Sequence, residues 1–244
     1  MSRFDIVSPE GLRVDGRRPP ELRRLSCRTG VFAQADGSAY IEQGNTKCLV
    51  AVYGPREPSK RLLTEKGPTI NVEYNVASFS SGERKTKMRK DRRLMEIASV
   101  IKQTFEPIIC YGQNVASRSE IDVNIQILQL DGGALHAAIN ATTLAMIDAG
   151  VPMRDFVCAC SAGWYKDTAL LDLNHLEESA DVPTLTVGLL PKSGKVTLLS
   201  LESRLHLDKF QSVLELASQG CERMRDELDS TIRKATQELA KTAL

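Results

Sequence analysis

The chain has 244 residues, of which 42% are hydrophobic, and its 32 basic and 31 acidic side chains give a formal net charge of +1. A chain of this length and composition can bury a sizeable core, which excludes an intrinsically disordered protein. The near-zero net charge argues against a nucleic-acid-binding surface over the whole molecule, so any such site has to be a local patch.

The six cysteines are scattered without a CxxC pair, at Cys27, Cys48, Cys110, Cys158, Cys160 and Cys221. This usage is typical of reduced thiols in an intracellular protein. Cys158 and Cys160 face the same way on a predicted strand, which would suit a metal ion or a packed core face, and we favour the core face. Without a signal peptide or an apolar run of 18 residues, we expect neither secretion nor a membrane span.

Residues 1–24 are polar and rich in arginine and proline, which predicts an extended arm that needs other structure, or another chain, to lie on. Alternating apolar residues then predict strands at 27–34, 38–43, 46–53 and 69–77. Asp36-Gly37 and Gly44-Asn45 supply hairpin turns. The connection 54–67 carries Lys60 and Arg61 and is too long for a simple turn, which is often a sign of function.

The densest positive patch of the chain follows, in the segment FSSGERKTKMRKDRR that contains Arg84, Arg92 and Arg93. Both a solvated mobile loop and an anion-binding surface fit such a run. The segment leads directly into a helix predicted from about Arg92 to Phe105, so two arginines begin a rigid element. An arginine pair at a helix N-terminus opposes the helix dipole, and an anionic partner would reverse this small cost.

The central segment combines a strand, a glycine turn, a helix and a second strand. Ile121 to Ile127 alternate as a half-buried strand, Asp131-Gly132-Gly133 stops it, and small residues predict a helix over 134–149. Glycines at a helix N-terminus make a candidate anion site, because the first amide N–H groups are unpaired. A tight strand-to-helix turn without any ligand fits the same spacing.

The second half repeats the order of strands followed by a helix. Strands are predicted at 156–163, 168–173, 184–190 and 195–201, and a long amphipathic helix begins at Asp208. Asp172 lies at the end of one of these strands, and Asn174 to Glu178 turn away from it. We therefore expect an α+β fold of two similar halves that meet near residue 153.

These segments together resemble the ribonuclease PH-type proteins, and among them the eukaryotic RNA exosome core subunit that corresponds to the catalytic ring subunit of archaeal exosomes. The resemblance covers nearly the whole chain. It is carried by RVDGRRPPELR (Arg13–Arg23), GSAYIEQGNTKCLVAVYGP (Gly37–Pro55), the arginine pair before LMEIASVI, LQLDGGALHAAINATTLAMIDAGVPMRD (Leu128–Asp155) and LLDLNHLEES (Leu170–Ser179).

The resemblance implies one ribonuclease PH-like domain over 1–244, similar to domain 2 of ribosomal protein S5. Its arm would be 1–21 and its halves about 22–153 and 156–240. It also implies a heterodimer with a second ribonuclease PH-like subunit in a hexameric ring, cap subunits of the S1 and KH type, and single-stranded RNA in the central channel. In active relatives, phosphate attacks the last RNA linkage and releases nucleoside diphosphates, often with a divalent metal.

The chain departs from the active pattern at the glycine turn. Active relatives carry Ser-Arg where this chain has Ala134 and Leu135, and neither of these can hydrogen-bond or hold the attacking phosphate. Asp172 matches one acidic position, and Glu178 stands at the second in place of the usual aspartate. We therefore interpret Asp172, Glu178, Ala134 and Leu135 as remnants of a catalytic site, without a metal or other cofactor.

The RNA-contacting residues of the family persist. Arg92 and Arg93 match the pair that contacts RNA, and Lys60 and Arg61 lie on the loop that lines the pore entrance. With Arg84, they are expected to hold phosphates without reading sequence. His136 and His175 lie near the remnant pocket and are expected to be structural.

The preferred hypothesis is a non-catalytic exosome ring subunit that guides RNA to an associated 3′ to 5′ nuclease, in ribosomal RNA maturation and messenger RNA turnover. The resemblance places it in the nucleus, nucleolus and cytoplasm. One alternative is an active phosphorolytic 3′ to 5′ exoribonuclease, against which Ala134 and Leu135 argue. Another is a stand-alone RNA-binding module, which the near-neutral charge disfavours.

Overall fold

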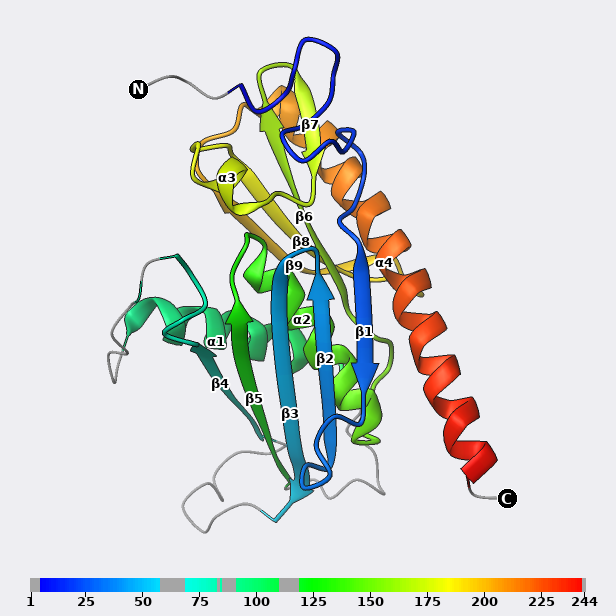
Figure 1. Ribbon diagram of the computed structural model, residues 1–244. Coiled ribbons are helices and arrows are strands. Elements are labelled where there is room, and N and C mark those ends of the chain that lie inside the picture. The colour runs from blue at the N-terminus through cyan, green and yellow to red at the C-terminus, as the bar shows by residue number, and fades with distance from the viewer. Residues whose placement is uncertain (1–4, 58–68, 83, 85–90, 110–118, 243–244) are drawn as a thin grey trace.

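The computed structural model describes residues 5–57, 69–82, 84, 91–109 and 119–242, and in it two β-sheets pack with helices between and beside them (Figure 1). The predicted α+β class is confirmed. Within the described part of the chain, none of the helices combines the length and the apolar character that a membrane crossing requires.

The first sheet holds five strands in the spatial order β1-β2-β3-β5-β4. In chain order, β1 to β5 are Leu25–Thr29, Gly37–Gln43, Thr46–Arg56, Thr69–Val76 and Glu120–Gln129. Only β4 and β5 run parallel, joined by a connection that includes the helix α1 (Arg92–Phe105). The C-terminal ends of β4 and β5 therefore lie at the same end of the strands as the Gly44-Asn45 turn between β2 and β3. We call this end of the sheet the upper edge (Figure 1).

The helix α2 (Ala134–Asp148) lies between the two sheets and contacts β2 and β3 on one side and β6 (Cys158–Tyr165) on the other. All its residues from His136 to Met146 are buried. The approach to the first sheet is close, since a Cβ atom on Gly37 would lie 2.3 Å from the Ala145 carbonyl oxygen. A helix enclosed on all sides explains why the sequence uses so many alanines here.

Two buried polar residues of α2 complete the second sheet. The Asn140 amide bonds the N–H and the C=O of Ala159 at 2.8 and 2.9 Å, and the Thr143 hydroxyl donates to the Val157 carbonyl at 2.9 Å. On one side of β6, the strand β7 (Thr168–Leu171) pairs with it only from Ala162 onward. The helix therefore satisfies backbone groups of this segment that the sheet leaves unpaired.

The second sheet has the order β7-β6-β8-β9. The strands β6 to β9 are Cys158–Tyr165, Thr168–Leu171, Thr184–Leu190 and Lys195–Glu202, and the one-turn helix α3 (His175–Glu178) follows β7. The helix α4 (Leu207–Thr242) packs across β6, β7 and β8 and reaches β1 of the first sheet. It thus ties the two sheets together, as Figure 1 shows.

Most predicted elements are found within two residues of their expected bounds, and two strands differ by more. The first strand ends at Thr29 and not at 34, and the third ends at Arg56 and not at 53. Smaller shifts place the start of the strand after α2 at Cys158 and not at 156, and the end of the strand before Asp172 at Leu171 and not at 173. Asp172 has a φ of +54°, a left-handed conformation that cannot continue a strand.

Candidate functional site

The turn Asp131-Gly132-Gly133 joins β5 to α2 at the upper edge and lies directly against α3. Gly132 and Gly133 have φ values of +78° and +67°, where glycine is strongly preferred. A Cβ atom on Gly132 would also lie 2.6 Å from the backbone carbon of Asn174. Both glycines are therefore required so that the first half can touch the second at this point.

The N-terminus of α2 already has an anionic partner from within the chain. The Gly133 N–H donates to Glu178 Oε1 at 2.7 Å, and the helix has no side-chain cap and no acidic residue in its own first turn. Ala134 and Leu135 occupy the first two helical positions and offer no polar side chain. Partial burial of the Glu178 carboxylate raises its pKa, and this effect outweighs the Gly133 N–H and the nearby His136 and Arg23.

Asp172 is fully buried, and its carboxylate is held mainly by one residue of the N-terminal arm, while Arg17 Nη1 lies farther away, at 3.9 Å from Oδ2. Oδ2 accepts the backbone N–H of Arg23 at 2.9 Å, and Oδ1 accepts Nη2 of the same residue at 2.7 Å. Burial by itself would raise the pKa of Asp172, but the neighbouring His136 imidazole and the Arg23 guanidinium outweigh it and hold that pKa well below its ordinary value. Asp172 is therefore ionised and paired.

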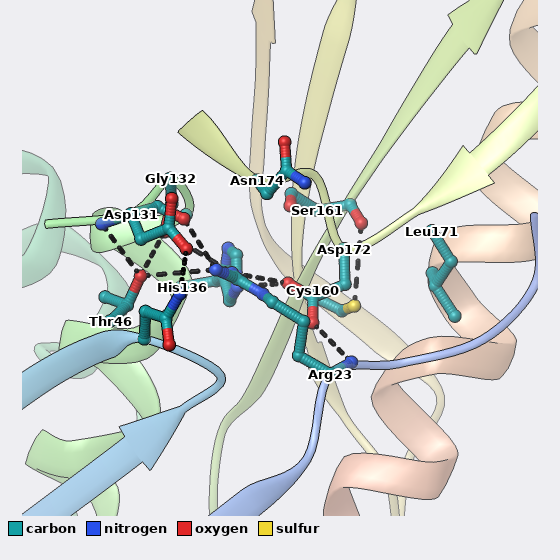
Figure 2. Close-up of polar contacts among 12 residues, drawn as sticks. Arg23, Thr46, Asp131, Gly132, His136, Cys160, Ser161, Leu171, Asp172 and Asn174 are labelled. Atoms are coloured by element: carbon teal, nitrogen blue, oxygen red, sulfur yellow. Dashed lines mark hydrogen bonds and ion pairs between the residues drawn. The ribbon is translucent and has the colours of Figure 1, made fainter. Parts of the chain in front are cut away.

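Arg23 connects the two halves of the molecule, as Figure 2 shows. Besides Asp172 in the second half, its guanidinium donates to the carbonyl oxygens of Asp131 and Gly132 in the first half, at 2.7 and 3.3 Å. The Thr46 hydroxyl donates to the same Gly132 carbonyl at 2.7 Å. One arginine thus orders both the glycine turn and the acidic residue opposite it.

A second arginine of the arm forms an ion pair that is buried completely. The Arg13 guanidinium bonds both carboxylate oxygens of Glu177, and both side chains have no exposed surface. It also donates to the Asp172 carbonyl at 2.9 Å. Glu177 and Asn174 form a capping box at the start of α3, so one carboxylate serves the arm and the helix together.

These arm residues are the part of the site that sequence reasoning missed. The arm was expected to need a surface to lie on, and the structure places it on its own second half, but Arg13 and Arg23 were not predicted as partners of Glu177 and Asp172. A signal for α3 was present, because Asn174 followed three residues later by Glu177 is a helix-start pattern. No local pattern connects residues about 150 positions apart.

The two acidic residues Asp172 and Glu178, which we call the acidic pair, do not suit a divalent metal. An arginine side chain lies 2.7 Å from Asp172, which opposes a second cation, and a Glu178 oxygen is bound to an amide. The described residues contain no cluster of three or more histidine, cysteine, aspartate or glutamate side chains with suitable geometry for a metal.

The predicted RNA-contacting arginines are carried by other segments of the chain than the acidic pair. Arg92 and Arg93 begin α1 and are exposed, with Asp91 as the helix cap accepting the Arg93 N–H at 3.0 Å. Arg84 is exposed as well. No hydrogen bond or ion pair joins these three guanidinium groups to another side chain in the described ranges. Lys60 and Arg61 lie outside the described residues.

The remaining predicted residues have structural surroundings. Cys158 and Cys160 are buried in the main core, and burial raises the pKa of both thiols. His136 is buried with Nε2 3.3 Å from Asp172 Oδ1, close enough for an ion pair when protonated but not in good hydrogen-bonding geometry. His175 begins α3 and is exposed.

Comparison with protein-family models gives two matches. Residues 21–152 match domain 1 of the 3′ exoribonuclease family, and residues 155–220 match domain 2 of the same family. The two matched regions correspond to the first sheet with α1 and α2, and to the second sheet with the first part of α4.

Curated relatives match over nearly the full length. The chain is 49% identical to the mouse protein named exosome complex component RRP41, over 98% of this chain and 97% of the relative. It is 42% identical to exosome complex component SKI6 of Saccharomyces cerevisiae, over 100% and 99%. It is also 42% identical to exosome complex component Rrp41 of the archaeon Thermococcus gammatolerans, over 96% and 95%.

The fold also matches a solved structure. The crystal structure of rice Rrp46 superposes with a TM-score of 0.79 and covers 91% of this chain and 100% of that one, at 24% sequence identity. The match confirms the expected ribonuclease PH-like architecture.

Proposed function

The chain belongs to the 3′ exoribonuclease family, and from this membership we propose that it is a non-catalytic ring subunit of the exosome complex that guides single-stranded RNA. The exosome assignment is supported by relatives with 49% and 42% identity that carry the name exosome complex component. Within such a ring its partners are a second ribonuclease PH-like subunit, S1/KH-type cap subunits and an associated 3′ to 5′ nuclease. The complex would act in the nucleus, nucleolus and cytoplasm.

The observation that carries the non-catalytic role is the state of the α2 N-terminus. A phosphorolytic site must hold a phosphate next to an acidic group. Here Ala134 and Leu135 present no donor side chain, and the Gly133 N–H is bound to Glu178. Asp172 is buried and paired with Arg23. A phosphate entering this site would meet a carboxylate in place of an arginine, which disfavours binding.

The RNA-guiding role is supported by Arg84, Arg92 and Arg93, which are exposed. Exposed cations along a path bind phosphates without base specificity. With Lys60 and Arg61, they would form the cationic wall of the channel.

The test is degradation of a 5′-labelled single-stranded RNA by the chain paired with its ring partner, with and without inorganic phosphate and magnesium. We expect no phosphate-dependent shortening. When a hydrolytic 3′ to 5′ nuclease is added, the RNA should be shortened in a way that depends on the ring but not on phosphate.

One observation favours the alternative of an active phosphorolytic exoribonuclease. The matched family is defined by 3′ exoribonucleases, and Asp172 is retained and ionised. Release of nucleoside diphosphates that requires phosphate would establish this alternative and overturn the non-catalytic role.

A further inference from the structure

Phe79 is the most exposed phenylalanine that the structure describes, with 72% of its surface open to solvent. It lies on the segment that follows β4 at the upper edge of the first sheet. This segment is anchored to β5 and its end, because the Ala77 N–H donates to the Ile127 carbonyl and the Leu130 N–H to the Ser80 carbonyl, both at 2.9 Å. The ring is thus presented by backbone that is fixed to the sheet on both sides of it.

An open hollow of about 620 Å³ lies next to this ring. Leu128 and Leu130 contribute apolar surface to its lining, and Asn45 and Gln129 contribute amide groups. An aromatic ring, apolar side chains and a few hydrogen-bonding groups together suit a flat heteroaromatic group with polar edges.

The hollow adjoins the glycine turn that leads to α2, since Asp131 also lines it. The same segment continues from Gly82 toward Arg84 and the helix that begins with Arg92 and Arg93. The exposed ring therefore shares a hollow with the glycine turn of the remnant site, and along the chain it comes shortly before the cations that are proposed to hold phosphates.

We propose that Phe79 is a base-stacking platform, on which a nucleobase of single-stranded RNA stacks while the hollow accepts its edge. This inference rests on the proposed RNA-guiding function and adds a base contact to a path made of phosphate contacts. Stacking on one ring is tolerant of sequence, because every base has a π-face. Gln129 would contact the base edge, and so would Asn45 through the amide atoms that remain beside its 3.0 Å hydrogen bond to Asp131 Oδ2.

The first test measures the affinity of the assembled complex for a fluorescein-labelled oligouridine, and for the same strand with abasic positions, over a series of salt concentrations. Phe79→Ala removes the side chain, and Phe79→Leu keeps an apolar side chain without an aromatic ring. Each should weaken binding of the normal strand by about 5- to 100-fold. Phe79→Tyr should retain most of the affinity. The abasic strand should lose little, and the salt dependence should stay as in the wild type because no charge is removed.

Phe32 offers a matched control. It is also exposed, at 43%, but it precedes β2 and so lies at the opposite edge of the sheet from Asn45. Phe32→Ala should leave RNA affinity unchanged. An equal loss for Phe32→Ala and Phe79→Ala would overturn the platform.

A spectroscopic measurement separates stacking from an indirect effect on folding. The tryptophan fluorescence of Phe79→Trp should be quenched when RNA is added, whereas that of Phe32→Trp should not. If charge reversal at Arg92 and Arg93 weakens binding but Phe79→Ala does not, and Phe79→Trp is not quenched, this inference fails while the RNA-guiding function stands. If the wild-type complex does not bind RNA, both fail.

Discussion

Asp172, which matches an acidic position of the family, is held by other residues of this chain. Its carboxylate is bound to Arg23 through the backbone and the side chain, and it has no exposed surface. An acid in this setting positions the arm and the glycine turn.

The depressed pKa of Asp172 predicts how stability depends on pH. A carboxyl whose pKa is lower in the folded state than in the unfolded one stabilises the fold above the unfolded value, which is near 3.8. That stabilisation is lost as pH falls from about 5 through the unfolded and folded values. Denaturant unfolding between pH 7 and pH 3 should therefore show a steeper loss for the wild type than for Asp172→Asn.

Asp172→Asn should also be less stable than the wild type at pH 7, because it leaves the Arg23 guanidinium buried without its counter-charge. Removing one member of a buried pair typically costs about 3 to 5 kcal/mol. Equal pH slopes for the two proteins would show that Asp172 is not the group whose protonation weakens the fold.

A second residue-scale prediction concerns phosphate binding at the start of α2. Ala134→Ser with Leu135→Arg restores a hydroxyl and a guanidinium, and a charge-assisted contact contributes roughly 1.5 to 3 kcal/mol. Titration calorimetry with inorganic phosphate should detect binding by this double variant and none by the wild type. We expect no turnover, because the other acidic position is still altered.

Glu178 supplies the internal control for that experiment. Its carboxylate accepts the Gly133 N–H and would repel an incoming phosphate, so adding Glu178→Gln, which removes the negative charge, should strengthen phosphate binding by the double variant further. Ala134→Ser with Leu135→Met, which adds no charge, should not bind. If Glu178→Gln has no effect on phosphate affinity, the carboxylate does not compete for the site.

Among the elements, the N-terminal arm depends most on long-range contacts. Its guanidinium groups reach Glu177 and Asp172 across more than 140 residues of sequence. Without these partners the arm is a polar segment with no regular structure, and with them it becomes a link between the sheets.

Arg13→Met should lower the free energy of unfolding by about 3 to 5 kcal/mol, because Glu177 would remain buried and unpaired. Replacing both partners by Arg13→Met and Glu177→Leu should cost considerably less, in spite of the lost cap on α3. Urea denaturation of the two single variants and the double variant gives the coupling. Lys166→Ala removes the exposed pair with Asp5 and should leave stability nearly unchanged.

At the scale of the whole molecule, the arginines at the start of α1 can be tested without disturbing the core. Arg92→Glu with Arg93→Glu changes two exposed side chains, so assembly of the ring should survive. RNA delivery to a downstream nuclease should weaken, and the salt dependence of RNA binding should decrease, because phosphate contacts are lost. Nuclease protection of a long RNA by the assembled complex measures this directly.

The matched control reverses two exposed lysines near the end of α4, by Lys234→Glu with Lys241→Glu. The change in net charge is identical, and RNA binding should be little affected. Intact delivery in the Arg92 and Arg93 variant would mean that the channel wall lies elsewhere.

Local pattern was sufficient to predict most elements of this fold. The alternation in β5 and the glycine turn before α2 are properties of neighbouring residues, and so is the three-and-four spacing of α4. The positions of Ala134 and Leu135 at the start of a helix followed from the same local signals. The comparison of these positions with Ser-Arg in active relatives came from the resemblance to ribonuclease PH-type proteins, and the loss of phosphate binding inferred from it stays a prediction.

What surrounds those positions was decided only by the folded chain. The pairing of Arg23 with Asp172, the ion pair of Arg13 with Glu177 and the capture of Gly133 by Glu178 all join residues that are far apart in sequence. Such contacts depend on how two sheets, a central helix and an arm pack together, and no short-range periodicity encodes that packing. Burial then decides their chemistry, because the pKa of a carboxyl depends on the charges and solvent around it.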